Sequence, residues 1–325
     1  MPSRRVSLAA ACLLVLAGSA CGAPDGPTAA ADPATIGFLR AIPTGPVNPA
    51  FVDELARAGF HHGQTLRFLG DAPDEVHTDP ADIEATLSTW GERGLDLLVA
   101  YSTSGADAAR NANPDLKILF LVNDPRAAGL VEREDRPEGN LTGVTFRVPA
   151  DRTLSLASRV VPGLDRVGLV LPANDPAARP HRDAVHAAAA ELGISVTDAP
   201  FASESEVAAA VEAVVASGAR ALFVSNSPQA VRARAQIAAA NADRLPVLAN
   251  TTVVDYAVVV LEPDTTQIHR QLGRQAVRLL SGASPRSVPV EDPARFRVVL
   301  RQDRASRHGL TLPQDVVREA DLVEP

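Results

Sequence analysis

Small polar side chains recur in this sequence at the points where short apolar runs end. Most are hydroxyls and carboxamides, which donate and accept hydrogen bonds and suit the binding of a small polar solute. Each cluster alone could be an ordinary helix cap, so their shared position favours the binding interpretation. The predicted binding residues are Ser102, Thr103, Ser104, Asn123, Asp124, Asn174, Asn226, Ser227, Asn250 and Thr251.

The run Ser102-Thr103-Ser104 is the clearest of these clusters. It follows the apolar run Leu95–Ala100, and Gly105 and an alanine-rich stretch follow it, which predicts the start of a helix. Free backbone N–H groups and the helix dipole favour an anion at that point. The sequence therefore predicts a carboxylate-binding turn here, with a serine-rich helix cap as the alternative.

Catalytic and metal-binding patterns are absent from the sequence. It contains no G-x-S-x-G elbow, no P-loop and no G-x-G-x-x-G motif. The pair His61-His62 lies at a predicted helix end, where a solvated pair is a more common arrangement than a metal site. We therefore expect no enzyme activity, no cofactor and no metal.

The elements that must position these residues alternate regularly along the chain. Short apolar runs predict strands, and longer alanine-rich runs between them predict helices such as Pro228–Ala240. The runs DLLVA and KILFLV are apolar at consecutive positions, which is typical of strands buried on both faces of a parallel sheet. The fold class is therefore predicted as α/β with Rossmann-like units, whose ligands bind at the carboxyl ends of the strands.

The pattern restarts near Arg166, which predicts two α/β lobes with parallel sheets joined by a hinge. Residues 34–147 with about 262–290 form the first predicted lobe. Residues 148–261 with about 291–325 form the second, including an expected strand at Ala257–Leu261.

The first 33 residues are predicted to be a targeting segment and a tether rather than part of the fold. Arg4 and Arg5 precede an apolar stretch that ends in small residues before Cys21, the order of a signal peptide covering residues 1–20. Cys21 after small residues predicts lipidation, although Gly18 stands where such motifs usually have leucine. A plain signal peptide is the alternative, and export by the Sec or the twin-arginine route stays open. Residues 21–33 are predicted to form a flexible tether.

Charge and cysteine content restrict the partners. The formal net charge is −8, which argues against nucleic acid as a partner because phosphate binding needs a basic face. Both cysteines, Cys12 and Cys21, precede the predicted body, which therefore has no disulfide and no thiol nucleophile. We expect a monomeric extracytoplasmic protein of a bacterium, held to the cell membrane by lipid.

Three segments resemble a known family. Asn123–Val144 resembles a segment of the tryptophan-type ABC transporter substrate-binding proteins, D-P-x-x-x-G-L-V followed by R-P-G-G-N-x-T-G-V, with Glu138 in place of a glycine. Ile268–Gln271 is similar to the family's Ile-Gly-Arg-Gln, and 297–313 is similar to its C-terminal strand and helix end. The resemblance covers about residues 34–315.

The resemblance implies a type I periplasmic-binding fold that closes on a solute and delivers it to an ABC permease. Family ligands include aromatic amino acids, held by a serine- and threonine-rich loop and by polar groups of the second lobe. By position, Ser102–Ser104 match the serine- and threonine-rich loop, and Asn226-Ser227 match the polar groups of the second lobe. Ser227 stands where an acidic residue is expected for the ammonium group, so Asp255 or Asp175 would have to replace it.

Three functions fit these observations to different degrees. A solute receptor for an ABC importer is the leading interpretation, and the solute is a small polar molecule such as an amino acid or a related small acid. A sensory binding protein that signals to a membrane partner is the alternative. An exported hydrolase is disfavoured by the missing nucleophile motif.

Overall fold

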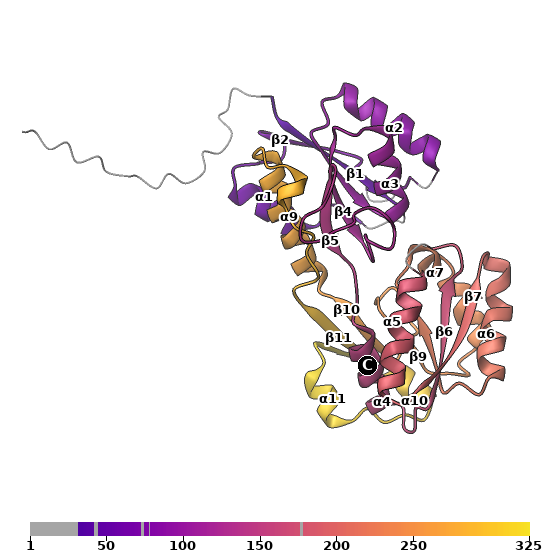
Figure 1. The fold of residues 1–325 in the computed structure, drawn as a ribbon. Coiled ribbons are helices and arrows are strands. Elements are labelled where there is room, and N and C mark those ends of the chain that lie inside the picture. Colours follow the sequence, from indigo (N-terminus) through magenta and orange to yellow (C-terminus); the bar gives the residue numbers. More distant parts are fainter. Residues whose placement is uncertain (1–31, 42–44, 73–74, 78, 176–177) are drawn as a thin grey trace, which may run out of the picture.

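The computed structural model of the 325-residue chain describes residues 32–41, 45–72, 75–77, 79–175 and 178–325 (Figure 1). The predicted signal peptide, Cys21 and most of the predicted tether lie outside these ranges. Within the described ranges, no helix is both long and apolar enough to cross a membrane. The described chain forms two α/β lobes, as the alternation of apolar runs predicted.

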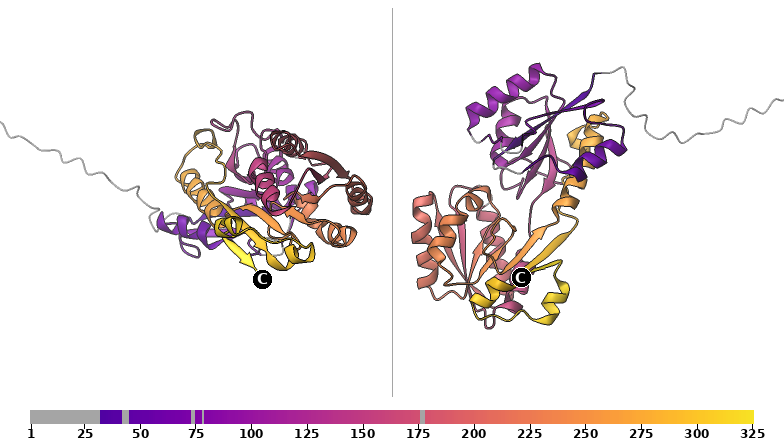
Figure 2. Two further views of the ribbon diagram at one scale, coloured as in Figure 1. Left: turned by 90° about the horizontal axis from the view of Figure 1, so that it is seen from below. Right: turned by 180° about the vertical axis from the view of Figure 1, so that it is seen from behind.

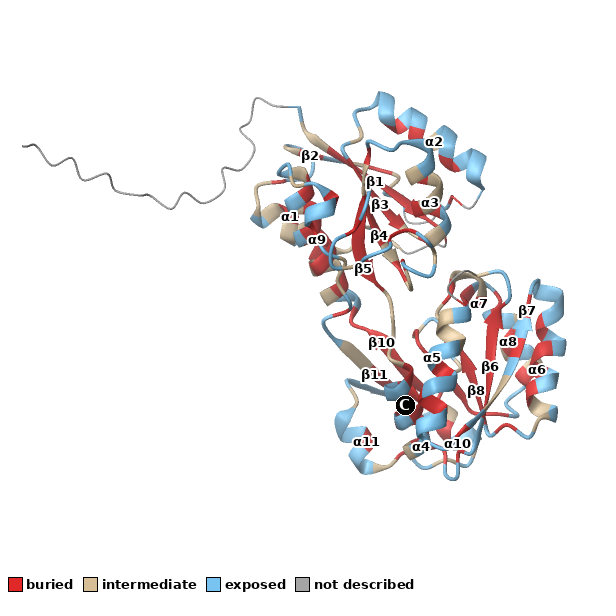
Figure 3. Cartoon of the chain, viewed as in Figure 1, coloured by how far each residue is buried: buried red, intermediate tan, exposed pale blue. Residues whose placement is uncertain are grey.

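Lobe 1 is built on five parallel strands in the order β2-β1-β3-β4-β5. The apolar runs in β3 and β4 lie near its centre and are buried because helices cover both faces of the sheet (Figure 3). The strands are β1 (Ala34–Arg40), β2 (Leu66–Leu69), β3 (Leu97–Tyr101), β4 (Lys117–Val122) and β5 (Leu141–Thr145).

Four helices complete the described part of lobe 1. Trp90 and its neighbours anchor α2 (Pro80–Glu92) to one face, which α3 (Thr103–Ala112) shares. The other face is covered by α1 (Pro49–Arg57) and α9 (Thr265–Leu280), which pack against each other. α9 belongs to a much later part of the sequence, so lobe 1 is not a continuous stretch of chain.

Lobe 2 contains a seven-stranded sheet in the order β12-β11-β10-β9-β8-β6-β7. Its pairings are parallel except that between β10 and β11. The strands are β6 (Arg166–Pro172), β7 (Ser195–Phe201), β8 (Ala221–Val224), β9 (Val247–Ala249), β10 (Val259–Pro263), β11 (Phe296–Arg301) and β12 (Leu322–Glu324).

The helices of lobe 2 also lie on both faces of its sheet. One face packs against α4 (Ala150–Val160), α5 (Ala178–Glu191), α10 (Gln302–Arg307) and α11 (Gln314–Glu319). The other packs against α6 (Val207–Ala216), α7 (Pro228–Arg232) and α8 (Arg234–Asn241). Short 3₁₀ turns lie at Glu204–Glu206 and Pro285–Ser287.

Some elements of lobe 2 differ from the sequence prediction. The expected helix Pro228–Ala240 is divided at Ala233 into α7 and α8, although no glycine or proline marks the break. The expected strand Ala257–Leu261 begins later, as β10, and α4 was not predicted. The N-cap residue of α4 is Pro149, which makes no side-chain hydrogen bond to the helix, so the sequence signal that usually marks a helix start is missing.

The chain passes between the lobes three times. The first crossover, residues 146–149, joins β5 to α4; the second, Pro263-Asp264, joins β10 to α9; the third, residues 291–295, leads to β11. The rear view shows these segments as the connection between the lobes (Figure 2). Pro263 still belongs to the sheet of lobe 2.

Candidate functional site

The lobes meet where polar loops follow β4 and β8. The Asn123 amide donates to Oδ1 of Asn226 over 3.1 Å, and the Asn226 amide donates to the Phe146 carbonyl of the first crossover over 3.2 Å. Both asparagines were predicted to be binding residues, and the structure brings them together. Because their amides already bond across the lobes, this pair also fixes one point of contact between the two sheets.

The start of α3 presents the predicted hydroxyl cluster at the carboxyl end of β3. Ser102 is buried and caps the helix, accepting a hydrogen bond from the Gly105 amide over 3.0 Å. A β-carbon on residue 105 would lie 2.8 Å from Ser102 Oγ, so a larger residue there would require the Ser102 hydroxyl to shift. Thr103 is half-buried and Ser104 is exposed. The turn thus combines hydroxyls with the amino end of a ten-residue helix.

Arg40 and His269 lie beside this turn and were missed by the sequence prediction. Arg40 ends β1, is 1% exposed, and places its guanidinium 5.4 Å from the Phe38 ring centre and 6.0 Å from that of Tyr101. It also donates to the Gly70 carbonyl. The imidazole of His269, from α9, lies 6.0 Å from the Tyr101 ring. A charged residue at the end of an apolar strand was the available signal for Arg40.

Burial sets the protonation of the two rings near α3. It raises the pKa of Tyr101 to about 12, although the Arg40 charge opposes the shift. It lowers the pKa of His269, against the hydrogen bond to the Thr265 carbonyl. Both rings are therefore neutral at physiological pH, and the Tyr101 ring lies next to the charged guanidinium of Arg40.

In lobe 2, the predicted residues fall into different environments. Ser227 is buried and caps α7 by accepting from the Ala230 amide over 3.2 Å. Asn174 is exposed on the loop after β6. Asn250 is 1% exposed, and its amide donates to Thr153 Oγ1 and to the Leu261 carbonyl inside lobe 2. The Asn250 side chain therefore fixes the end of β9.

The loop between β9 and β10, which includes Thr251, is held in place by Arg301. The buried Arg301 guanidinium donates to the carbonyls of Thr252, Val254 and Ala257, over 3.1 to 3.3 Å. Its Nε donates to the Glu324 carboxylate over 2.6 Å. One arginine thus connects the loop after β9 with the last strand of the sheet, a long-range contact that sequence spacing does not reveal.

The carboxylates considered for an ammonium group occupy distinct positions. Asp255 is exposed on the Arg301-held loop, and Asp175 is half-buried after β6. Glu262 is 6% exposed and was not predicted; its carboxylate accepts from the Thr252 amide over 2.7 Å and lies 3.4 Å from Arg297. Glu262 thus supports the loop through these two contacts.

Several buried polar atoms in the described part of lobe 2 have no hydrogen-bond partner, and they lie on different faces of its sheet, since His181 contacts Phe223 in one apolar cluster and Tyr256 packs against the other. They include Nε2 of His181, Oε1 of Gln229 and the hydroxyl of Tyr256. Burial lowers the pKa of His181 to about 4, so its imidazole is neutral. Burial, assisted by the Asp255 charge, raises the pKa of Tyr256. Of these groups, His181 and Gln229 belong to helices that follow β6 and β8, where they retain hydrogen-bonding capacity.

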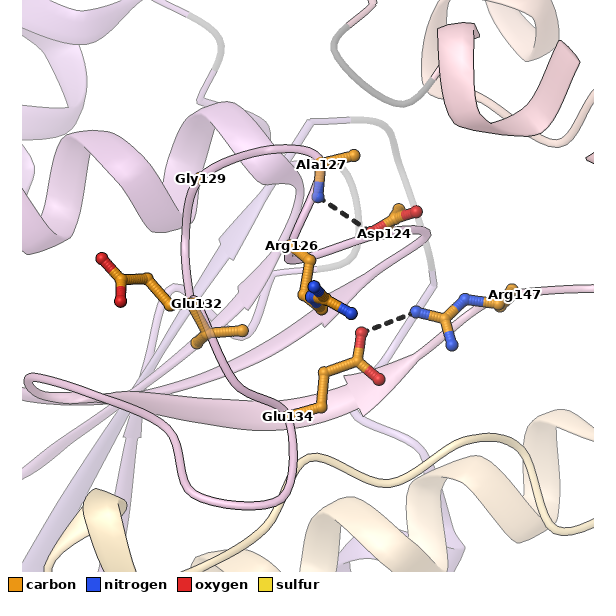
Figure 4. A pocket seen from close by; sticks show the side chains of 8 residues that line it. Asp124, Arg126, Ala127, Gly129, Glu132, Glu134 and Arg147 are labelled. Atoms are coloured by element: carbon orange, nitrogen blue, oxygen red, sulfur yellow. Dashed lines mark hydrogen bonds and ion pairs between the residues drawn. The ribbon is translucent and has the colours of Figure 1, made fainter. Parts of the chain in front are cut away.

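A charged pocket of about 820 Å³ lies beside the Asn123–Asn226 contact (Figure 4). It is formed by the loop after β4 and by Arg147 of the first crossover. Asp124, a predicted binding residue, lines it and caps a turn by accepting from the Ala127 amide over 3.0 Å. Glu134 and Arg147 form an ion pair of 2.7 Å across the pocket. Among the described residues, no group of three or more potential ligand side chains could hold a metal ion.

Comparison of the sequence with known proteins finds a family model and a relative, and both are described as substrate- or ligand-binding proteins. The family model described as ABC transporter substrate binding protein matches residues 49–324. The tyrosine-binding protein of Clostridioides difficile (strain R20291) is 24% identical over 258 residues, which are 78% of this chain and 73% of that protein.

Solved structures share the fold at low sequence identity. The ABC domain in complex with L-Trp from Streptococcus pneumonia has a TM-score of 0.80 at 23% identity, covering 90% of this chain and 100% of that chain. A conserved domain protein from Vibrio cholerae has a TM-score of 0.76 at 23% identity, covering 90% and 99%. The ligand-free, open structure of a substrate-binding protein with adhesive properties from Clostridium difficile has a TM-score of 0.69 at 22% identity, covering 90% and 99%. The predicted two-lobed α/β fold is confirmed.

Proposed function

Because this chain belongs to the ABC transporter substrate-binding protein family, we propose that it captures an amino acid between its lobes and delivers it to an ABC importer. The match to the family model confirms the family that the segment Asn123–Val144 predicted. Membership in a family of substrate-binding proteins also supports a role without catalysis.

The observation that carries the proposed ligand class is the start of α3. Ser102, Thr103 and the free N–H groups of the first helical turn offer neutral donors and a positive dipole end to a carboxylate. Phe38, Tyr101 and His269 lie close by, and the names of the relatives point to tyrosine and tryptophan. We therefore propose an aromatic amino acid whose carboxylate lies at α3.

In the proposed mechanism, lobe 1 and lobe 2 each supply part of the site. A solute that contacts both lobes favours the arrangement in which both sets of contacts form, and the importer binds that arrangement. The neutral groups of lobe 2, among them His181 and Gln229, are proposed to complete the site. Asp175 or Asp255 is proposed to pair with the ammonium group, since a buried ammonium needs a charged partner.

Calorimetric titration tests this proposal directly. We expect one molecule of L-tyrosine or L-tryptophan to bind per chain. The analogue 3-(4-hydroxyphenyl)propionate lacks the ammonium group, and tyramine lacks the carboxylate. Each analogue is expected to bind at least about tenfold more weakly than the amino acid. Purines and sugars are the matched negative panel. Tight binding of a member of that panel, with none by amino acids, contradicts the proposed ligand class.

The importer is tested in cells. Deleting the gene is expected to reduce the uptake of the radiolabelled amino acid that the titration identifies. Unchanged uptake, together with a ligand-dependent change in gene expression, would instead favour a sensory role.

We also propose that Cys21 carries the lipid anchor of a monomeric extracytoplasmic protein. The change Cys21→Ala is expected to abolish incorporation of radiolabelled palmitate, because the thiol is the site of lipid attachment. Cys12→Ala is the matched control and should keep full labelling. Labelling that persists in Cys21→Ala, or that disappears in Cys12→Ala, contradicts the anchor.

A further inference from the structure

The three crossovers are bonded to one another. Amide and carbonyl groups join Thr145 to Glu291 over 2.8 Å and Asp264 to Arg295 over 2.9 Å. Gln271 of α9 is 3% exposed, and its side-chain amide makes three hydrogen bonds to the third crossover. Its nitrogen donates to the Glu291 carboxylate and to the Asp292 carbonyl, and its oxygen accepts from the Ala294 amide. These bonds, one of them to the Glu291 carboxylate, fix the third crossover to lobe 1.

The first crossover is held mainly by charge. The Arg147 guanidinium bridges two carboxylates, Glu134 over 2.7 Å and Asp292 over 3.1 Å. Glu134 belongs to the loop after β4 and Asp292 to the third crossover, so one side chain connects three segments. Asp292 also accepts from the Thr145 hydroxyl over 2.6 Å, immediately before the first crossover.

The charges around Arg147 depend on one another. Burial disfavours its charged form, but the hydrogen bond to Glu134 and the charges of Asp292, Glu134 and Asp124 hold its pKa above the ordinary value. Without the guanidinium, these three carboxylates would repel one another. The arginine is therefore a bridge whose removal reverses the local interaction from attraction to repulsion.

We propose that Arg147, with Glu134 and Asp292, is a positioning device that restricts rotation of the lobes about the crossovers. The Glu134-Arg147-Asp292 clamp fixes the first crossover to the third, and a rotation that changes the backbone angles of residues 146–147 moves Arg147 against its partners and strains the clamp. This inference rests on the proposed function in one respect: if the lobes close on a solute, the clamp sets how often the closing rotation occurs.

The clamp is accessible to solvent, which limits its strength and makes it sensitive to salt. The side chains of Arg147 and Asp292 are 40% and 59% exposed. An exposed ion pair changes a population ratio by about 1.5- to 5-fold, and high salt screens it. The clamp should therefore adjust the distribution of lobe orientations without locking it.

Spin-label distances between the lobes test the clamp. Ala85 on α2 and Ala209 on α6 are exposed and can be replaced by cysteine in the full chain after Cys12→Ser and Cys21→Ser. In Arg147→Gln we expect the population outside the main distance peak to rise about 1.5- to 5-fold. Arg147→Lys should fall between this variant and the parent, because one ammonium cannot hold two carboxylates as the guanidinium does.

Two controls separate the clamp from general loss of structure. Arg133 forms an ion pair of 2.7 Å with Asp135 on the same loop, and this pair does not include a crossover residue. Arg133→Gln removes the pair and should leave the spin-label distances between the lobes unchanged. Asp292→Asn keeps an acceptor for Thr145 and should broaden the distribution as Arg147→Gln does. At 1 M salt, the parent should resemble Arg147→Gln.

The clamp is contradicted if Arg147→Gln and Arg133→Gln are both folded and give the same distribution of spin-label distances. Adding L-tyrosine and L-tryptophan to the same labelled samples tests the proposed function separately. If neither amino acid moves the distances, the proposed ligand class fails, whereas the comparison of the two arginine variants still decides the clamp.

Discussion

Replacing Ser102 by aspartate is expected to weaken the binding of L-tyrosine or L-tryptophan by about 100- to 1,000-fold, because two like charges about 4 Å apart repel by about 4 kcal/mol near a protein surface. The proposed site places the solute carboxylate at the start of α3, where Ser102 now offers a neutral hydroxyl. Aspartate is as good an N-cap as serine, so the helix itself should persist. Calorimetric titration measures the loss.

Ser102→Asn is the matched control for this prediction. Asparagine has the size of aspartate and also caps helices, so it reports the effect of bulk next to Gly105 without the charge. We expect Ser102→Asn to bind clearly more tightly than Ser102→Asp at equal thermal stability. If both variants bind equally, the solute carboxylate does not lie at α3.

The change Arg301→Met is expected to lower the free energy of unfolding of lobe 2 by about 2–4 kcal/mol, because it leaves buried carbonyl groups and a carboxylate without their donor. Arg301 supplies hydrogen bonds to three carbonyls of the loop after β9 and pairs with Glu324. Methionine has a similar length and preserves the packing of the stem. Urea unfolding followed by circular dichroism measures the change.

A surface arginine of the neighbouring helix provides the comparison. Arg307 pairs with Asp243 over 3.3 Å and is 52% exposed, so Arg307→Met should change the stability by less than about 0.5 kcal/mol. Arg301→Met should also weaken solute binding, since Asp255, a proposed partner of the ammonium group, lies on the loop that Arg301 holds. Equal stability of the two variants would show that these bonds contribute little.

The fold was largely predictable from the sequence because its strands are apolar on consecutive residues. β3 and β4 illustrate this: from Leu97 to Ala100 and from Ile118 to Val122 every residue is apolar, because both faces of the sheet are covered. α4 was missed because it starts at Pro149 without a capping side chain. The break at Ala233 was missed because packing, and no local signal, divides α7 from α8.

The sequence predicted where polar loops follow strands, while the role of these loops in binding stays a prediction. Ser102, Asn123 and Asn226 were found by that rule, and two of them contact each other across the lobes. Arg40 was missed because it ends a strand and does not lie in a loop. His269 approaches Tyr101 from α9, and Asn250 is turned into the lobe 2 core; both depend on tertiary packing.

The discontinuous lobes have a consequence for the order in which the chain can fold. The sheet of lobe 1 is complete at Thr145, but one of its faces is covered by Ile268, Leu272 and Leu279 of α9. While the chain is being made, the part of that apolar face which α1 does not cover would remain exposed until nearly all of lobe 2 had been made. The sheet of lobe 2 itself needs β11 and β12 from the last residues. Neither lobe can therefore finish folding before the other is almost entirely synthesised, so the nascent chain exposes apolar surface that chaperones recognise.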